Sequence, residues 1–337
     1  MSVLLGFALL TLASAPLEKQ VSFIGAGGFK LYGTLTMPAS SSGRAIPGVI
    51  LLPGSGPTDR NGNQPPQLVT DLLKEISNSL AENGIASFRF DKRAAAIYAS
   101  SFPKDSALWP DFFKWENFVE DATAAYRFLG SQVGVDPKHM AIIGHSEGAE
   151  IAFQIGSNLK ADPNRPAALI SMGGAGRPMG PILIEQIDRA LTRQQAPAPV
   201  KKQYMDGLKK ILDQIVKDGT YPADMPQGFT SLFNVSTTKI MRSYCTIDPS
   251  KLAQNFEGDV LLINGGHDTQ ISPVRDTPLL QAALQGRKSG SVEMLILPDA
   301  SHNLKSTKAG NDDAFTGPMD SVALAKINQF LKKKLQP

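Results

Sequence analysis

The serine at position 146 is the residue of this 337-residue chain whose surroundings most suggest chemistry. It stands between Gly144 and Gly148 in a G-x-S-x-G pentapeptide, after an apolar run at 140–143 and before apolar residues at helical spacing over 151–155. This pattern predicts a buried strand, a sharp turn at the serine and a helix, with glycines where side chains would collide. A serine held in such a turn can act as a nucleophile if a base lies beside it and N–H groups face the developing negative charge.

The base for Ser146 must come from one of four histidines. His302 follows the last predicted strand and lies in a loop, as a catalytic base in this position would. His139 precedes the strand that leads to the serine, and His145 is held by the turn itself. His267 also follows a strand and is the competitor, although the aspartate next to it is better suited to orient a base. The sequence therefore predicts His302 as the base.

An acid that orients His302 is predicted at Asp268, which follows the penultimate strand, 34 positions earlier. The resulting chain order Ser, Asp, His is used by one class of serine hydrolases. His302 would accept the proton of Ser146 and return it to the leaving group, while Asp268 fixes the imidazole tautomer. The alternative role for Asp268 is capping the next helix. Asp299 is a second candidate acid, but it is only three residues from His302 and badly placed to reach the same ring.

Two backbone N–H groups are predicted to form an oxyanion hole. One belongs to Glu147, at the start of the helix after the serine, and the other to Ser55 in the Gly54-Ser55-Gly56 loop. The alternative for that loop is an ordinary Gly/Pro turn.

The elements that must position these residues alternate along the chain. Two strands at 21–24 and 30–37 read as an antiparallel hairpin. Further buried strands are predicted at 47–52, 85–90, 140–143, 167–172, 259–264 and 292–297, with helices at 68–83, 120–129, 278–284 and 320–335. We therefore expect an α/β fold with an eight-stranded, mostly parallel sheet, helices on both faces and the site at the carboxyl ends of the strands. Between 177 and 250 the pattern changes to helices, such as 181–193 and 200–217, without strands.

Composition limits the function classes. The net charge is +3, from 34 basic and 31 acidic residues, and the one basic run, at 332–334, ends a predicted helix, so we expect no nucleic-acid partner. The single Cys245 excludes an internal disulfide and a multi-cysteine metal site. No histidines have metal-ligand spacing, and we expect neither metal nor cofactor. After the N-terminus no segment is apolar enough for stable membrane insertion.

Residues 1–15 resemble a signal peptide, with an apolar run over 3–12 followed by Ala-Ser-Ala at 13–15. This favours a secreted or periplasmic protein. No Lys or Arg precedes the run, and Pro16 follows the cleavage position, so a buried N-terminal segment in a cytoplasmic protein is the alternative.

Taken together, these motifs make the chain resemble an α/β-hydrolase of the bacterial esterase-like group related to serine aminopeptidases and dienelactone hydrolases. The matching segments are Pro53-Gly54-Ser55-Gly56-Pro57, Asp59-Arg60, Gly62-Asn63, Phe90-Asp91-Lys92-Arg93, the pentapeptide at 144–148, Asn264-Gly265 with Asp268 and Gln270, and Ser301-His302-Asn303. The resemblance implies carboxylesterase-type hydrolysis by a core of 16–176 and 251–337, with a helical cap at 177–250. Ala94-Ala95-Ala96 departs from the Gly-rich turn that usually follows Asp-Lys-Arg in such proteins.

The substrate is expected to be a small, uncharged, short-acyl ester, since no arginine cluster indicates an anionic one. Aromatic residues of the 102–118 loop and the cap could line its pocket, although packing of the cap onto the core explains them equally well. They are Trp109, Phe113, Phe229, Phe233 and Tyr244. Three other functions fit the same residues: an aminopeptidase-like serine peptidase, a thioesterase or acyltransferase, and a non-catalytic binding protein. The sequence carries no signal for an oligomeric state.

Overall fold

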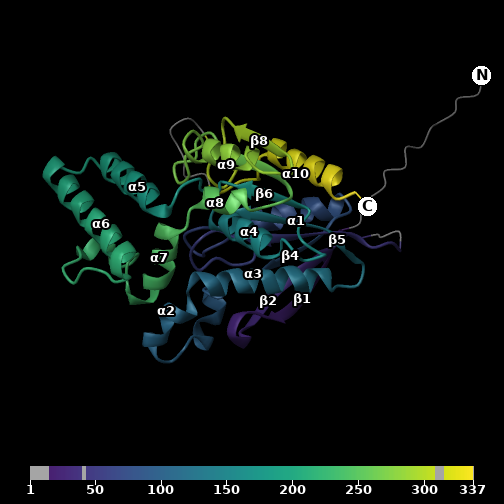
Figure 1. Ribbon diagram of the computed structural model, residues 1–337, viewed down its shortest axis with the longest axis horizontal. Coiled ribbons are helices and arrows are strands. Elements are labelled where there is room, and N and C mark those ends of the chain that lie inside the picture. Colours follow the sequence, from purple (N-terminus) through teal and green to yellow (C-terminus); the bar gives the residue numbers. More distant parts are fainter. Residues whose placement is uncertain (1–14, 40–42, 308–314, 337) are drawn as a thin grey trace, which may run out of the picture.

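One eight-stranded sheet organises the computed structural model, which describes residues 15–39, 43–307 and 315–336 (Figure 1). The strand order is β1-β2-β4-β3-β5-β6-β7-β8, antiparallel between β1, β2 and β4 and parallel elsewhere. The bounds are β1 Leu17–Ile24, β2 Lys30–Met37, β3 Ile46–Leu52, β4 Ala86–Phe90, β5 Val135–His145, β6 Ala168–Met172, β7 Asp259–Gly265 and β8 Val292–Leu297. The predicted eight-stranded, mostly parallel sheet is confirmed. The predicted signal peptide falls almost entirely on residues 1–14, outside the described residues.

The central strands are apolar on both sides because helices cover both faces of the sheet. In β3, Ile50 and Leu52 point into one hydrophobic cluster, and Val49 and Leu51 into the other. The first cluster is closed by α3 (Trp115–Gly130), α4 (Glu147–Asn158), α8 (Pro249–Gln254) and α9 (Asp276–Gln285). The second is closed by α1 (Leu72–Glu82) and α10 (Ser321–Lys334). The central strands are thus held from both sides, which fixes where each of them ends.

The β5 strand is longer than its apolar run predicted. It begins at Val135, and its register against β3 shifts between the pairs Ile46–Val135 and Gly48–Met140. Pro137 lies in the shifted segment, where a residue without an N–H interrupts a regular ladder. His139 therefore lies inside the strand instead of before it, and its Nδ1 is 2.8 Å from Asp136 Oδ2.

Between β6 and β7 the described elements are all helical. They are α5 (Met179–Arg193), α6 (Ala198–Asp218), the 3-10 turns η4 (Gln227–Phe229) and η5 (Val235–Thr237), α7 (Thr238–Thr246) and α8. The helices α5, α6 and α7 project from one end of the sheet and surround a hydrophobic cluster of their own (Figure 1). We call this group, residues 177–250, the helical segment. The helical segment meets the core near α2 (Trp109–Phe112). Three 3-10 turns complete the described elements: η1 (Ala26–Gly28) joins β1 to β2, and η2 (Ala96–Ser101) and η3 (Ser106–Leu108) precede α2.

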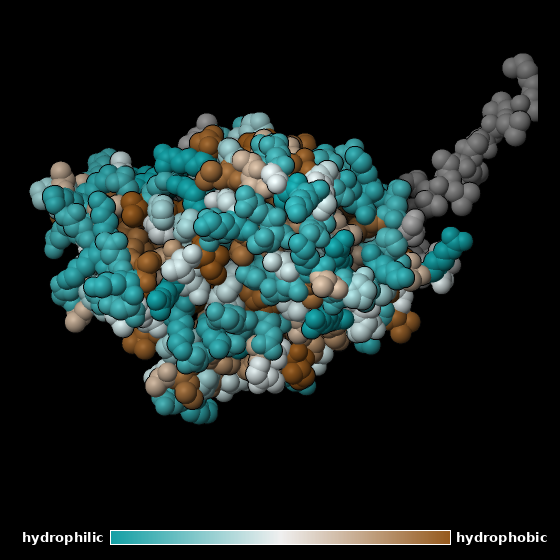
Figure 2. Space-filling view, viewed as in Figure 1, coloured by the Kyte–Doolittle hydropathy of each residue, from teal (hydrophilic) through white to brown (hydrophobic). Residues whose placement is uncertain are grey.

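Figure 2 shows the side chains on one face of the molecule. Hydrophilic side chains predominate there, and hydrophobic ones occur in small groups. Within the described ranges, none of the helices combines the length and the apolar character needed to cross a bilayer.

Candidate active site

Ser146 occupies a strained turn between β5 and α4. Its φ of 53° and ψ of −125° lie in a region that non-glycine residues rarely adopt, and its N–H donates to Met172 O at 2.8 Å. The turn is tight because strand and helix cross at the two glycines. A Cβ on Gly144 would lie 2.2 Å from Gly148 O, and one on Gly148 would lie 2.4 Å from Leu52 O. The geometry therefore needs glycine at both positions.

We expect Gly144→Ala to lower the free energy of unfolding by at least about 3 kcal/mol, because its methyl group would collide with backbone that has no room to move. Gly180→Ala in α5 is the matched control, since a Cβ there meets nothing within 4 Å. The control should be neutral or stabilise the protein by up to about 1 kcal/mol. Urea denaturation measures both, and equal stability of the two variants would contradict the close crossing.

Asp268 and His302 form a buried pair after β7 and β8. His302 Nδ1 is 2.7 Å from Asp268 Oδ2, and the two residues are 4% and 5% exposed. The other carboxylate oxygen of Asp268 accepts the N–H groups of Gln270 and Ile271, both at 2.8 Å. Asp268 does not cap a helix, since α9 begins only at Asp276. The hydrogen bonds of Asp268 Oδ1 hold the loop and leave Oδ2 to accept from the imidazole. His302 Nδ1 therefore carries the proton of the neutral ring, and His302 Nε2 has a free lone pair.

The end of β6 brings His302 to the serine turn. Ser146 donates to Met172 O, and a Cβ on the next residue, Gly173, would lie 3.0 Å from His302 Cε1. On the other side, the rings of His145 and His302 have centroids 4.7 Å apart, and His145 Nε2 is 3.0 Å from His302 O. Ser146, Asp268 and His302, which are distant in sequence, thus lie at the same end of the sheet.

His145 supports the His302 loop as a neutral group. Burial, together with the neighbouring His302, lowers the pKa of His145 to about 3. Its Nε2–H therefore donates to the His302 carbonyl throughout the physiological pH range. The two other sequence candidates lie outside this cluster: His267 Nε2 is 3.9 Å from Asp299 Oδ1, and the Asp299 side chain is 87% exposed.

The predicted oxyanion donors flank the serine. A Cβ on Gly54 would lie 3.3 Å from Ser146 Cβ, so the Gly54–Ser55 peptide lies against the turn. The Ser55 N–H donates to no backbone acceptor within the described residues. Glu147 opens α4, where the first N–H groups have no partner inside the helix. Both groups thus belong to segments next to Ser146, and their role as oxyanion donors stays a prediction.

The burial of the charges around the turn, and the ion pair of Lys92, were not predicted from the sequence. The Asp-Lys-Arg run after β4 is buried, with exposures of 3%, 4% and 1%. Asp91 pairs with Arg60, Lys92 with Glu147, and Arg93 with Asp121. The available signal was three charged residues directly after a strand, β4, whose five residues are all buried.

Glu150, one turn along α4 from Glu147, has a strongly perturbed carboxyl group. Burial raises its pKa to about 8, and the carboxylates of Glu147 and Asp276 add to the shift. Tyr244 of α7 lies near the carboxyl groups of Glu147 and Glu150, and burial of its hydroxyl together with Glu147 raises the pKa of Tyr244 well above its usual value. The environment beside the serine turn therefore disfavours added negative charge.

We expect Glu150→Gln to remove a pH dependence of stability. Between about pH 4.5 and pH 8 the folded protein keeps the Glu150 proton and the unfolded chain has lost it, so wild-type stability falls as pH rises. At pH 9 the variant should be more stable than the wild type by up to several kcal/mol, the size set by the difference between the folded and unfolded pKa of Glu150. At pH 4.5 the two proteins should differ little. Denaturation at the two pH values measures this. A gap independent of pH would show that the carboxyl is ordinary.

The five predicted pocket residues lie in different surroundings. Trp109 and Phe113 pack edge to face, 6.4 Å between centroids, and Trp109 Nε1 donates to Pro103 O. Phe229 and Phe233 are 4% and 0% exposed inside the cluster of the helical segment. Tyr244 is the one that approaches the serine turn, where it also packs against Trp115 at 6.1 Å.

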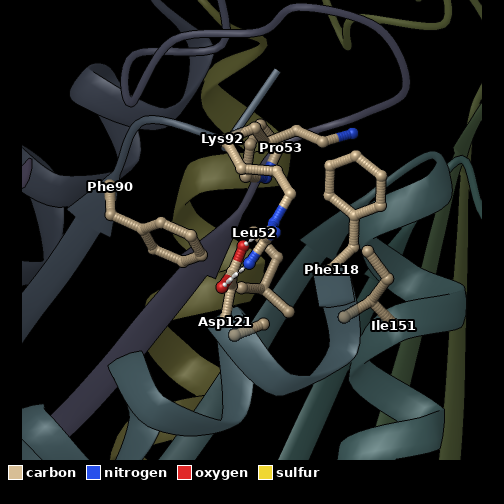
Figure 3. Close-up of a pocket in the computed structure, with 9 residues that line it drawn as sticks. Leu52, Pro53, Phe90, Lys92, Phe118, Asp121 and Ile151 are labelled. Atoms are coloured by element: carbon tan, nitrogen blue, oxygen red, sulfur yellow. Dashed lines mark hydrogen bonds and ion pairs between the residues drawn. The ribbon is translucent and has the colours of Figure 1, made fainter. Parts of the chain in front are cut away.

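A small cavity of about 10 Å³ lies between β3, β4, α3 and α4, beneath Lys92 (Figure 3). Leu52, Pro53, Phe118 and Ile151 are among its lining residues. A cavity of this volume has room for about one water molecule, so it cannot hold an acyl chain. In the described part of the chain, no group of three or more His, Cys, Asp or Glu residues is placed to hold a metal ion.

Known structures share this fold at low sequence identity. An esterase from Pyrococcus furiosus is 15% identical over 99% of this chain and 97% of its own, with a TM-score of 0.58. An acylaminoacyl peptidase from Pyrococcus horikoshii is 13% identical over 95% of this chain, with a TM-score of 0.59. Dipeptidyl peptidase 4 from Porphyromonas gingivalis is 14% identical over 95% of this chain, with a TM-score of 0.57. This chain covers only 42% and 36% of the two peptidases.

No curated protein matches the chain by sequence. Residues 118–307, more than half of the chain, match the family described as BAAT / acyl-CoA thioester hydrolase C terminal. The matched region runs from α3 through β5, the serine turn and the helical segment to the His302 loop. The predicted relationship to α/β-hydrolases is therefore confirmed, and the chain is a hydrolase of the α/β-hydrolase superfamily that belongs to the BAAT / acyl-CoA thioester hydrolase C-terminal family.

Proposed function

We propose that this protein is a serine hydrolase that cleaves carboxylic esters through an acyl-enzyme on Ser146. The observation that carries the proposal is the strained serine at the end of β5, at the same end of the sheet as a buried imidazole that is hydrogen-bonded to Asp268. A structural turn has no need of a buried Asp–His pair next to it. This combination is the recurring arrangement for activating a serine hydroxyl.

The reaction follows from the orientation of the groups. His302 Nε2 takes the hydroxyl proton as Ser146 Oγ forms a bond to the carbonyl carbon, and Asp268 stabilises the imidazolium. The carbonyl oxygen gains negative charge and is bound by the N–H groups of Ser55 and Glu147. The bond to the alkoxide breaks as His302 returns the proton. Water then attacks the acyl-enzyme by the same steps, releasing the acid and restoring the serine.

A small, uncharged, short-acyl ester fits the surroundings best. The carboxylates of Glu147 and Asp276 lie close enough to Glu150 to raise its pKa, which disfavours an anionic group beside the serine turn. We assign residues 177–250 as a cap, with Tyr244 as its contribution to the pocket, because this residue reaches the serine turn.

Thioester hydrolysis is the second candidate, and the family match favours it, since the family description names acyl-CoA thioesters. The same triad would serve both, because a thiolate replaces the alkoxide as leaving group. The two candidates differ in whether the site accepts the bulky, phosphorylated coenzyme.

The wild-type protein tests both candidates. We expect covalent labelling by a fluorophosphonate probe, and turnover of p-nitrophenyl esters that falls with acyl length. Matching acyl thioesters of coenzyme A and of uncharged N-acetylcysteamine separate leaving-group chemistry from coenzyme binding. Faster turnover of the coenzyme A series would replace the ester assignment by the thioester one. Turnover of aminoacyl anilides but not of esters would indicate a peptidase. Absence of labelling would indicate the non-catalytic binding protein.

We also propose that residues 1–15 are removed on secretion. Intact-mass measurement of exported protein should then show an N-terminus at Pro16. A full-length mass would instead support the cytoplasmic alternative.

A further inference from the structure

A buried lysine lies behind the two backbone groups assigned to the oxyanion hole. Lys92 Nζ is 2.8 Å from Glu147 Oε2 and 3.1 Å from Gly54 O. The Lys92 and Glu147 side chains are 5% and 2% exposed, and the ammonium lies 4.8 Å from the centre of the Phe118 ring, its neighbour in Figure 3. One cation therefore contacts both chain segments that supply the proposed donors.

The contact with Gly54 acts on the orientation of the Ser55 N–H, together with the Thr58 hydroxyl, which donates to the same carbonyl at 3.3 Å. The carbonyl of Gly54 and the N–H of Ser55 belong to one peptide group, and in a planar trans peptide they point in opposite directions. When the oxygen is held by Lys92, the N–H is directed away from the lysine. The next carbonyl, of Ser55, is held by Gln64 Nε2 at 2.7 Å, so the loop has little freedom to rotate this peptide.

The contact with Glu147 acts on the other donor. Glu147 is the first residue of α4, and its side chain is tied to the same ammonium that holds Gly54. This bond fixes the distance between the loop and the helix start, and therefore the spacing of their two N–H groups. A hydrogen bond from an ammonium also polarises the Gly54–Ser55 peptide, which strengthens its N–H as a donor.

Stability alone does not account for the Lys92–Glu147 ion pair. A buried ion pair recovers its desolvation cost only with excellent geometry, and apolar residues of similar volume are often equally stabilising. Here the Oε1 atom of Glu147 is buried, and no atom of the described residues meets it with regular hydrogen-bond geometry, although the Tyr244 hydroxyl interacts with this carboxylate. A carboxylate held mainly through Lys92 is expected if the ion pair serves the geometry of the loop.

We propose that Lys92 is a positioning residue of the oxyanion hole, orienting the Ser55 N–H through the Gly54 carbonyl and the α4 start through Glu147. The inference rests on the proposed function. Loss of one oxyanion donor lowers kcat by about 10²–10³-fold, so a misdirected donor should lower it by about 10–100-fold. Substrate binding before charge develops should change little, so KM should stay within about threefold.

The test is the double variant Lys92→Met/Glu147→Gln, in which no unpaired charge remains buried. Its kcat, counted per site that a fluorophosphonate titrates, should fall by about 10–100-fold with little change in KM. A trifluoromethyl ketone, which forms a charged tetrahedral adduct, should bind more weakly by a similar factor. A general loss of structure would instead reduce the number of titrated sites.

Arg93→Met/Asp121→Asn is the matched control, because it removes a neighbouring ion pair of similar burial, with each side chain 2% exposed, that does not contact Gly54. It should lower the melting temperature while leaving kcat per titrated site unchanged. If Lys92→Met/Glu147→Gln fails to fold, Lys92→Met/Glu147→Met offers an apolar pair and the same readouts.

The outcomes separate the two proposals. A wild-type protein that neither labels nor turns over overturns the hydrolase assignment, and the role of Lys92 with it. An active wild type, with a Lys92 double variant that keeps kcat within about twofold or loses it only as much as the control does, overturns the role of Lys92 alone.

Discussion

Replacing Ser146 by alanine is expected to lower kcat for ester hydrolysis by about 10⁴–10⁶-fold and to abolish fluorophosphonate labelling, because no other group can form the acyl-enzyme. Residual turnover would come from binding and the oxyanion donors alone. The backbone at position 146 has a φ of 53°, which alanine tolerates about as poorly as serine, so stability should change by less than about 1 kcal/mol.

Ser157→Ala, at the far end of the same helix, is the matched control and should label like the wild type. Mass spectrometry of the labelled peptide identifies the modified residue directly. Labelling that persists in Ser146→Ala, at another serine, would remove the proposed mechanism while leaving the fold untouched.

Asp268→Asn is expected to lower kcat by about 10⁴-fold with little loss of stability. The amide can still accept the N–H groups of Gln270 and Ile271 through its remaining oxygen, so the loop should stay in place. Its nitrogen, however, would donate to His302 Nδ1 at the position where the carboxylate now accepts. The imidazole would then carry its proton on Nε2 and could no longer accept one from Ser146.

The control for this variant is Asp299→Asn, which removes the other aspartate near His302 and should retain wild-type kcat, because that side chain is 87% exposed. Hydrolysis of a p-nitrophenyl ester by both variants gives the comparison, and thermal unfolding checks that both are folded. A large loss in Asp299→Asn with none in Asp268→Asn would exchange the two roles.

These expectations could be written largely from the sequence because hydrophobic periodicity is a local property. Buried runs of four to six residues and one alternating hairpin predicted the strands, and parallel strands place their carboxyl ends at one edge of a sheet. Residues that follow strands, such as Ser146, Asp268 and His302, were therefore expected to be neighbours before any distance was known. The boundary of β5 was missed because the register shift around Pro137 depends on pairing with β3.

The electrostatic surroundings of the turn were decided by the tertiary structure. Lys92 and Glu147 are 55 positions apart, and His145 and the carbonyl of His302 are 157 apart, so no local pattern links them. The pKa of Glu150 depends on burial and on Asp276, which arrives from another helix. Phe229 and Phe233 read from sequence as pocket or packing residues alike, and only the fold placed them inside the helical segment.

The sequence by itself thus determined the sheet and the order of Ser146, Asp268 and His302 along the chain, since burial periodicity and chain order are written in one dimension. The tertiary structure alone decided which charges face one another behind the turn. Pairing, desolvation and peptide orientation depend on distances between segments remote in sequence, and those distances exist only once the chain has folded.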